Sequence, residues 1–313
     1  MEMMLRFHLE MQDMDLTHFT RLCRRYATHT NETSQNLPGL LVFHREVTSS
    51  FEAFVYQPII CLVLQGSKIT SIGDQCAELQ AGDALLVSHD LPVVSTITKA
   101  SAQEPYLAVI LSLDLGLVRS LYEQIGDSVA PVGSVRSFSA GPADSTWCEP
   151  LGRYIALMES SLDAQVLGPS ILREIHYRLL MSPIGGMLRN LLSVDSHASR
   201  IAKAIQRIRA EFQSSLSVAE LAGIAGMSSS SFHGHFKLVT GTTPLQYQKD
   251  LRLVEARTLL AKASHSVSAA AFAVGYESPT HFCRDYSRKF GAPPSRDVGA
   301  FISDVQSAQT MTA

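Results

Sequence analysis

Residues 217 to 294 decide the fold of this chain, because one pattern occurs in them twice. Residues 217–241 have the sequence SVAELAGIAGMSSSSFHGHFKLVTG, and residues 266–291 have the sequence SVSAAAFAVGYESPTHFCRDYSRKFG. The turn glycine recurs at an offset of 49 residues and four later positions recur at an offset of 50, so the second copy has one extra residue just after its turn. Such self-similarity is typical of two related structural units. The matched pairs are Gly226 and Gly275, Phe232 and Phe282, Phe236 and Tyr286, Gly241 and Gly291, and Pro244 and Pro294.

The first copy predicts a helix, a tight turn and a second helix. Ser217 and Glu220 have the capping-box spacing of a helix start. Gly226 would end this helix, because glycine adopts positive φ at little cost. Phe232 and Phe236 lie one turn apart in the second helix and would pack against the first. The first copy is therefore interpreted as a helix-turn-helix over about residues 217–240.

The second copy, over about residues 267–290, repeats this arrangement. Small residues precede its turn glycine, Ser278 is the expected cap of its second helix, and Phe282 and Tyr286 are its buried pair. A long helix from Pro244 to Leu260 is predicted between the copies. Such a rod would hold the two second helices at a fixed separation, which for adjacent major-groove segments is roughly 34 Å.

The free faces of the two second helices carry the candidate DNA-binding residues. Short polar side chains on such a face suit a helix that enters a major groove, and an arginine can bind a guanine edge or a phosphate. One helix-turn-helix pattern alone would be weak evidence, but two in register are specific. The four aromatic residues are expected to be core residues, and His233, His235 and His281 are expected to be surface or packing residues instead of metal ligands. The candidates are Ser229, Ser230, His233, Gly234, Lys237, Thr280, His281, Arg284 and Arg288.

Composition indicates two different domains. The chain has 313 residues and a formal net charge of −3, yet residues 197–300 contain 13 basic against 7 acidic residues, whereas residues 1–196 contain 13 against 21. A basic module joined to an acidic one fits a DNA-binding domain joined to a domain with another task. The five cysteines are scattered, and no apolar run could act as a signal or cross a membrane, so we expect a cytoplasmic protein.

The N-terminal part predicts strands followed by helices. Short β-rich segments separated by turn residues occur at residues 40–44, 54–56, 59–65, 68–72, 84–88, 93–97 and 106–113. Such regular short strands imply a small antiparallel barrel or sandwich. Three helices are expected after it, at residues 114–125, 147–162 and 170–181. They would pack on the barrel, and one of them could also serve self-association.

The domain boundary is expected near residue 195. We therefore predict a domain of residues 1–195, a DNA-binding domain of residues 196–300 and a tail of residues 301–313. The second domain would start with an amphipathic helix at residues 197–212. The basic residues of its outer face contact phosphates or only keep the face soluble, and the sequence does not separate the two readings. They are Arg200, Lys203, Arg207 and Arg209.

The paired motifs resemble the DNA-binding domain of AraC/XylS-type transcriptional regulators over about the last third of the chain. The resemblance rests on both turns and on the end of the second copy, residues 290–295. It implies base contacts by Ser230, Gly234, Thr280 and Arg284. The chain departs from the family pattern at Gly234, where members often have a long polar side chain. Arg296 and Asp297 also stand in place of the usual closing tyrosine and arginine.

Residues 40–190 resemble the N-terminal sensing domain of one branch of the same family. The segments that carry the resemblance are QPIICLVLQGSK at residues 57–68, Gly82-Asp83, EPYL at residues 104–107 and REIHYRLL at residues 173–180. The resemblance implies a cupin-like barrel that binds an effector or mediates dimerisation. The expected fold class is thus α+β, with an N-terminal cupin-like β-barrel with packed helices and a C-terminal all-α domain with two helix-turn-helix motifs.

The function expected from these patterns is sequence-specific transcriptional regulation, with double-stranded DNA and a small-molecule effector as partners. RNA polymerase and a second copy of the chain are further candidate partners. The alternatives are an enzyme, of the cupin or methyl-acceptor type, fused to a DNA-binding domain, and a barrel that only dimerises. We expect no catalytic residue, no metal and no cofactor, because His44 and His89 are isolated, Cys61 lies in an apolar run and no phosphate loop is present.

Overall fold

A computed structural model of the chain describes residues 17, 19–24, 37–49, 52–125, 136–193, 196–261 and 265–297. The domain boundary predicted near residue 195 and the tail predicted at residues 301–313 lie outside these residues. None of the described helices combines the length and the apolar composition that crossing a bilayer requires.

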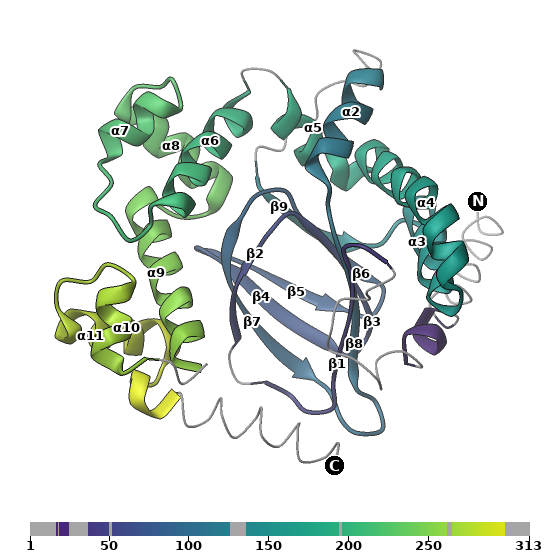
Figure 1. Ribbon diagram of the computed structural model, residues 1–313, viewed down its shortest axis with the longest axis horizontal. Helices are drawn as coiled ribbons and strands as arrows, with labels where there is room; N and C mark the ends of the chain where they lie inside the picture. Colours follow the sequence, from purple (N-terminus) through teal and green to yellow (C-terminus); the bar gives the residue numbers. More distant parts are fainter. Residues whose placement is uncertain are drawn as a thin grey trace.

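The N-terminal part is a barrel-like pair of antiparallel sheets that face each other (Figure 1). This confirms the mixed fold class and the predicted barrel. The five-stranded sheet has the order β1-β8-β3-β6-β9 and the four-stranded sheet the order β2-β7-β4-β5. The strands are β1 (Leu40–Arg45), β2 (Glu52–Tyr56), β3 (Ile59–Gln65), β4 (Ser67–Ile72), β5 (Gln75–Gln80), β6 (Asp83–Val87), β7 (Leu91–Lys99), β8 (Tyr106–Ser112) and β9 (Phe138–Pro142).

Strand β3 shows why the five-stranded sheet lies in the middle of the domain. Its residues are buried on both faces. Ile60 and Leu62 belong to the core beneath the helices, whereas Cys61 and Val63 belong to the core inside the barrel. Because successive side chains of a strand point to opposite faces, a continuous apolar run is what a sheet covered on both sides requires.

Helices cover the outer face of this sheet (Figure 1), and the helical residues 19–24 add the buried side chains of Phe19 and Cys23 to the same core. Trp147 and Ile175 are fully buried there among the outward side chains of the strands. The helix predicted at residues 147–162 is interrupted, since it ends at Ala156, a 3-10 turn follows over Leu157–Glu159, and the hydroxyl of Ser160 caps a new helix. The helices are α2 (Leu115–Ile125), α3 (Ser145–Ala156), α4 (Ser161–Met181) and α5 (Gly186–Leu192).

The C-terminal part is helical and contains the two predicted helix-turn-helix units. Helices α8 and α11 have equivalent bounds 50 residues apart, whereas α7 and α10 lie 49 residues apart, so the extra residue does follow the second turn. Both second helices end at a left-handed glycine. The helices are α6 (His197–Ala210), α7 (Val218–Ile224), α8 (Ser229–Thr240), α9 (Pro244–Ala261), α10 (Val267–Ala273) and α11 (Pro279–Phe290).

The barrel and the first helix-turn-helix unit share a hydrophobic core. One cluster of buried side chains continues from the inner face of the barrel strands into helices α6, α7 and α8. Tyr247 of α9 is fully buried in it, and its hydroxyl donates a hydrogen bond to the backbone carbonyl of Asp90, in the turn between β6 and β7. The two parts of the chain are therefore packed together, with α9 beside the barrel (Figure 1).

Candidate nucleic-acid interface and interdomain pocket

Helix α8 separates its buried and exposed faces as the sequence predicts. The Ser228 hydroxyl accepts a hydrogen bond from the Ser231 amide (3.3 Å) and so caps the helix. Phe232 and Phe236 are fully buried with ring centroids 5.5 Å apart, which confirms them as core residues. The five candidate DNA-binding residues of this helix are all exposed: Ser229, Ser230, His233, Gly234 and Lys237.

Helix α11 presents a second exposed face with more positive charge. Phe282 and Tyr286 are fully buried, and Ser278 caps the helix. The Arg288 guanidinium donates to the Asp285 carboxylate (2.7 Å), whereas Arg284 has no ionic partner among the described residues. The four candidates of this helix are exposed: Thr280, His281, Arg284 and Arg288. Exposure makes all nine residues available to DNA, and their contacts with it remain predictions.

Helix α9 joins the two units through Arg252, a residue that the sequence analysis did not single out. Its guanidinium donates to the carbonyls of Phe212 (2.6 Å) and Gly275 (2.9 Å), and also to those of Gln213 (3.1 Å) and Ser214 (2.9 Å). One side chain thus holds the segment after α6 against the turn of the second unit. The available signal for this role was an arginine placed between two leucines, Leu251 and Leu253.

Asp297, one of the two departures from the family pattern, has an internal structural role. Its carboxylate accepts a bidentate pair of hydrogen bonds from Arg257 (2.8 and 3.0 Å) and a third from the Tyr286 hydroxyl (2.6 Å). Bidentate arginine–carboxylate pairs are among the stronger polar contacts in proteins. The residue therefore fastens α11 to α9.

The histidines on α8 and α11 form no metal site within the described residues, where no cluster of three or more His, Cys, Asp or Glu has a metal-binding arrangement. His235 instead stacks on His197 of α6, with ring centroids 3.6 Å apart. Partial burial lowers the pKa of His235, and the neighbouring His197 lowers it further. His235 therefore packs two helices together as a neutral ring.

The barrel interior holds a polar cluster around Cys61 and Lys68. Both residues are buried, and the Lys68 ammonium donates to the Cys61 sulfur (3.5 Å). Two residues along the same strand, the hydroxyl of Thr70 lies 3.0 Å from that of Ser95. Cys61 is a core residue, as predicted, but it has a cationic neighbour that the apolar run around it does not reveal.

A tight turn of the barrel contacts the end of α8. The amide of Asp74, between β4 and β5, donates to the carbonyl of Gly241 (3.2 Å). The Ser137 amide likewise donates to the carbonyl of Val239 (3.0 Å). Gly73 has φ of +60°, and a Cβ there would come within 2.3 Å of the Gly241 oxygen. Only a residue without a side chain allows this approach.

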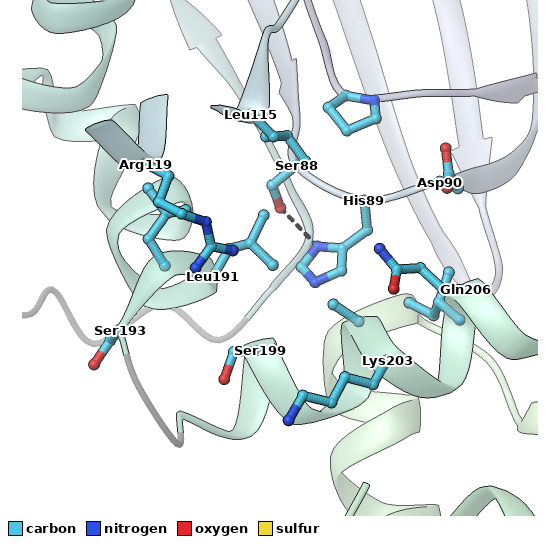
Figure 2. A pocket seen from close by; sticks show the side chains of 14 residues that line it. Ser88, His89, Asp90, Leu115, Arg119, Leu191, Ser193, Ser199, Lys203 and Gln206 are labelled. Atoms are coloured by element: carbon cyan, nitrogen blue, oxygen red, sulfur yellow. Dashed lines mark hydrogen bonds between the residues drawn. The ribbon is translucent and has the colours of Figure 1, made fainter. Parts of the chain in front are cut away.

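A cavity of about 380 Å³ lies where the two parts of the chain meet (Figure 2). Its walls come from the β6–β7 turn, from α2 and α5, and from α6 of the helical domain. His89 is buried at its floor, where its ring lies 2.9 Å from the Ser88 hydroxyl and 3.4 Å from the Ala198 carbonyl. Burial lowers the pKa of His89 to about 4, although the contact with Ala198 raises it slightly. The histidine is therefore neutral near pH 7.

Family models match both parts of the chain. Residues 36–187 match the N-terminus of AraC-type transcriptional regulators, and residues 221–297 match a helix-turn-helix domain. The chain belongs to the AraC family. In this AraC-family chain, the two matched regions coincide with the barrel and its helices and with the paired helix-turn-helix units.

Curated relatives of this AraC-family chain include two transcriptional activators. The activator RhaS of Escherichia fergusonii is 30% identical over 153 residues, which are 48% of this chain and 54% of RhaS. The activator RclR of Escherichia coli is 36% identical over 106 residues, which are 34% of this chain and 37% of RclR. The chain thus spans about half, or less, of the length of these relatives.

Among solved structures, the fold resembles ToxT of Vibrio cholerae. Its structure with a bound unsaturated fatty acid has a TM-score of 0.54 at 12% sequence identity and covers 85% of this chain and 97% of ToxT. At this identity the likeness concerns the fold, which in both proteins combines the N-terminal and the C-terminal part in one arrangement.

Proposed function

We propose that this AraC-family chain is a sequence-specific transcriptional regulator that binds double-stranded DNA with helices α8 and α11. The observation that carries the proposal is that α8 and α11 have matching exposed faces. Each helix is fixed in place by two buried aromatic side chains at equivalent positions, Phe232 and Phe236 in α8 and Phe282 and Tyr286 in α11. Two recognition helices on one rigid support can enter successive major-groove segments. Family membership and the two activators among its relatives support the same function.

The second recognition helix is the stronger candidate for reading bases. Arg284 offers an exposed guanidinium with no ionic partner among the described residues, and such a group can donate to both acceptors of a guanine edge. The exposed face of α8 has serines, His233 and Gly234. These short groups let the helix approach the groove closely, but they distinguish bases less well than an arginine does. Arg288 is paired with Asp285, so its guanidinium is less free to make two hydrogen bonds to a base edge. We therefore assign it to phosphate contact.

The basic face of α6 is less suited to phosphate contact than the sequence suggests. Arg209 is paired with Asp90 of the barrel (2.5 Å), and Arg207 is paired with Glu211. Arg200 donates to the carbonyl of Gly226 (3.3 Å). Lys203 lines the interdomain pocket. Arg209 and Arg200 therefore support packing between domains and between helices, and we leave all four residues out of the proposed DNA interface.

The N-terminal domain, proposed as residues 1–195, would sense a small molecule, and residues 196–300 would bind DNA. The shared core and the contact of the β4–β5 turn with α8 give the barrel a direct path to the first recognition helix. A ligand controls such an arrangement only if it binds one domain arrangement better than another. The proposed regulator has no catalytic step, and RNA polymerase and a second copy of the chain remain proposed partners.

The test is selection of DNA sites from a random pool by the full-length chain, followed by footprinting of the selected sites. We expect protection of two segments about one helical turn apart on one face of the duplex. Binding at moderate salt that does not discriminate selected from random DNA would contradict a sequence-specific regulator, since non-specific binding is mostly electrostatic. Arg284→Ala serves as the matched variant that should change the selected sequence.

A further inference from the structure

The interdomain pocket joins elements that lie far apart in the sequence. Leu115 and Arg119 come from α2, whereas Ser199 and Lys203 come from the first turns of α6 (Figure 2). Pockets at domain junctions are preferred sites for small ligands, and those of a few hundred Å³ accept metabolite-sized molecules. A molecule bound here would touch both domains at once.

Positive charge on this pocket is unbalanced. Arg119 and Lys203 have no hydrogen bond or ion pair among the described residues, and Figure 2 shows them on two different walls. The one acidic residue of the lining, Asp90, is neutralised by Arg209, whose guanidinium lies 2.5 Å from its carboxylate. Neutral His89 adds no charge of either sign.

The remaining lining indicates the character of the ligand. The amide of Gln206 can donate a hydrogen bond to a molecule in the cavity, and the hydroxyl of Ser199, which donates to the Ser196 carbonyl (3.0 Å), can accept one. Leu115 and Leu191 add apolar surface to the lining. Two cationic side chains, an amide donor and apolar surface match a small organic molecule that carries anionic groups at its ends.

We infer that this pocket binds a small organic dianion of the dicarboxylate class, with Arg119 on the sensing domain and Lys203 on the DNA-binding domain as its two cationic contacts. The inference rests on the proposed function and names the effector class for it. Because the ligand spans both domains, it binds the docked arrangement better than a separated one. By linkage, the ligand and DNA must influence each other's affinity whenever DNA favours another arrangement.

The experiment measures thermal unfolding of the full-length chain with succinate, inorganic phosphate, or sodium chloride at equal ionic strength. A ligand that binds the folded chain raises its unfolding temperature. We expect succinate to raise it by several degrees at millimolar concentration and chloride to leave it unchanged. The phosphate arm separates an organic dianion site from a general anion site, and an equal shift with phosphate would overturn the dicarboxylate assignment.

Matched variants locate the binding. Arg119→Gln and Lys203→Gln should each weaken the apparent affinity for succinate about tenfold. Lys99→Gln removes an exposed lysine ammonium far from this lining, 3.9 Å from Glu104, and should change nothing. Equal succinate shifts in all three variants, or no shift in the wild type with succinate or with longer dicarboxylates up to adipate, would refute the site. Unliganded unfolding temperatures show whether each variant is folded.

A separate measurement keeps this inference distinct from the proposed function. The Kd for a selected DNA site is compared with and without succinate in the wild type and in Lys203→Gln. A change in the wild type that the variant lacks supports coupling through the pocket. Succinate binding that leaves the Kd for DNA unchanged would overturn the effector role while the anion site itself stands, and loss of all DNA binding would concern the proposed function alone.

Discussion

Asp74, at the tip of the β4–β5 turn, lies 3.6 Å from the ammonium group of Lys237 in the last turn of α8. This ion pair joins the barrel to a residue that we expect to contact DNA. Both side chains are more than half exposed, so the pair contributes little to folding stability. The pair should instead affect DNA binding, because Asp74 and a DNA phosphate compete for the ammonium group of Lys237.

We predict that Asp74→Asn strengthens DNA binding. Exposed ion pairs contribute about 0.2–1 kcal/mol, so the gain should be at most about fivefold in Kd. Fluorescence anisotropy with a selected DNA site measures it. Asp163→Asn, in the first turn of α4, removes the same charge elsewhere and controls for net charge. Equal Kd values for Asp74→Asn and Asp163→Asn would show that the pair does not restrain Lys237.

Arg284→Ala should cost about 1–3 kcal/mol of binding free energy and relax the preference at one base position, as expected for an arginine on a guanine edge. Site selection with the variant gives both quantities. Arg288→Ala is the comparison variant: as the proposed phosphate contact, it should weaken binding about equally on all sequences and leave the base preference unchanged. A uniform loss on all sequences for Arg284→Ala would reassign this residue to phosphate contact.

Replacing the two turn glycines should have unequal effects. Both have positive φ, +63° at Gly226 and +85° at Gly275, so alanine is strained at either position by about 1 kcal/mol. At Gly275 a Cβ would also come within 2.0 Å of the Gln213 carbonyl oxygen, whereas nothing lies within 4 Å at Gly226. Urea unfolding should therefore show a clearly larger loss for Gly275→Ala. Equal losses would contradict the close contact between the second turn and the segment after α6.

The buried His89 should make stability depend on pH. Its pKa is lowered from 6.5 to about 4 by burial, so the unfolded chain binds more protons than the folded chain between these values. The free energy of unfolding should therefore fall as pH is lowered from about 6.5 to about 4, by at most about 3 kcal/mol from this group. Burial also lowers the pKa of His176, which acts in the same direction.

Comparison of the wild type with His89→Gln isolates this contribution. The variant loses the hydrogen bonds of the ring, so the slope of stability against pH is the quantity to compare, not its absolute value. Urea unfolding at several pH values gives the slope, and His233→Gln on the exposed face of α8 is the control. A slope in His89→Gln as steep as in the wild type would show that His89 does not titrate in the predicted range.

The sequence predicted those features that depend on local chemistry. The capping box at Ser217, the positive-φ glycines and the four-residue aromatic spacing each have a local physical cause, and all three are confirmed. Strand β5 was missed because its polar and apolar residues lie on an edge strand, and β9 because Gly141 and Pro142 resemble a turn. These strands depend on partners that are distant in the sequence.

The interdomain features could not be predicted for the same reason. Lys203 belonged to a basic helical face, and nothing local to it indicates that Arg119, more than eighty residues earlier, lines the same cavity. For Asp74 the sequence indicates only a turn, at Gly73-Asp74. Its position beside Lys237 follows from how the two domains pack. Periodicity identifies the buried face of each helix but does not identify which distant surface it meets.

Arg252 has a consequence for the spacing of the DNA sequence that this protein can recognise. Because it bonds to carbonyls on both sides of the junction, the two recognition helices cannot slide or rotate independently without breaking several hydrogen bonds. A second site displaced by even one base pair rotates by about a tenth of a turn around the duplex and leaves the reach of α11. Binding sites of this regulator should therefore tolerate base substitutions much better than insertions or deletions between their two halves.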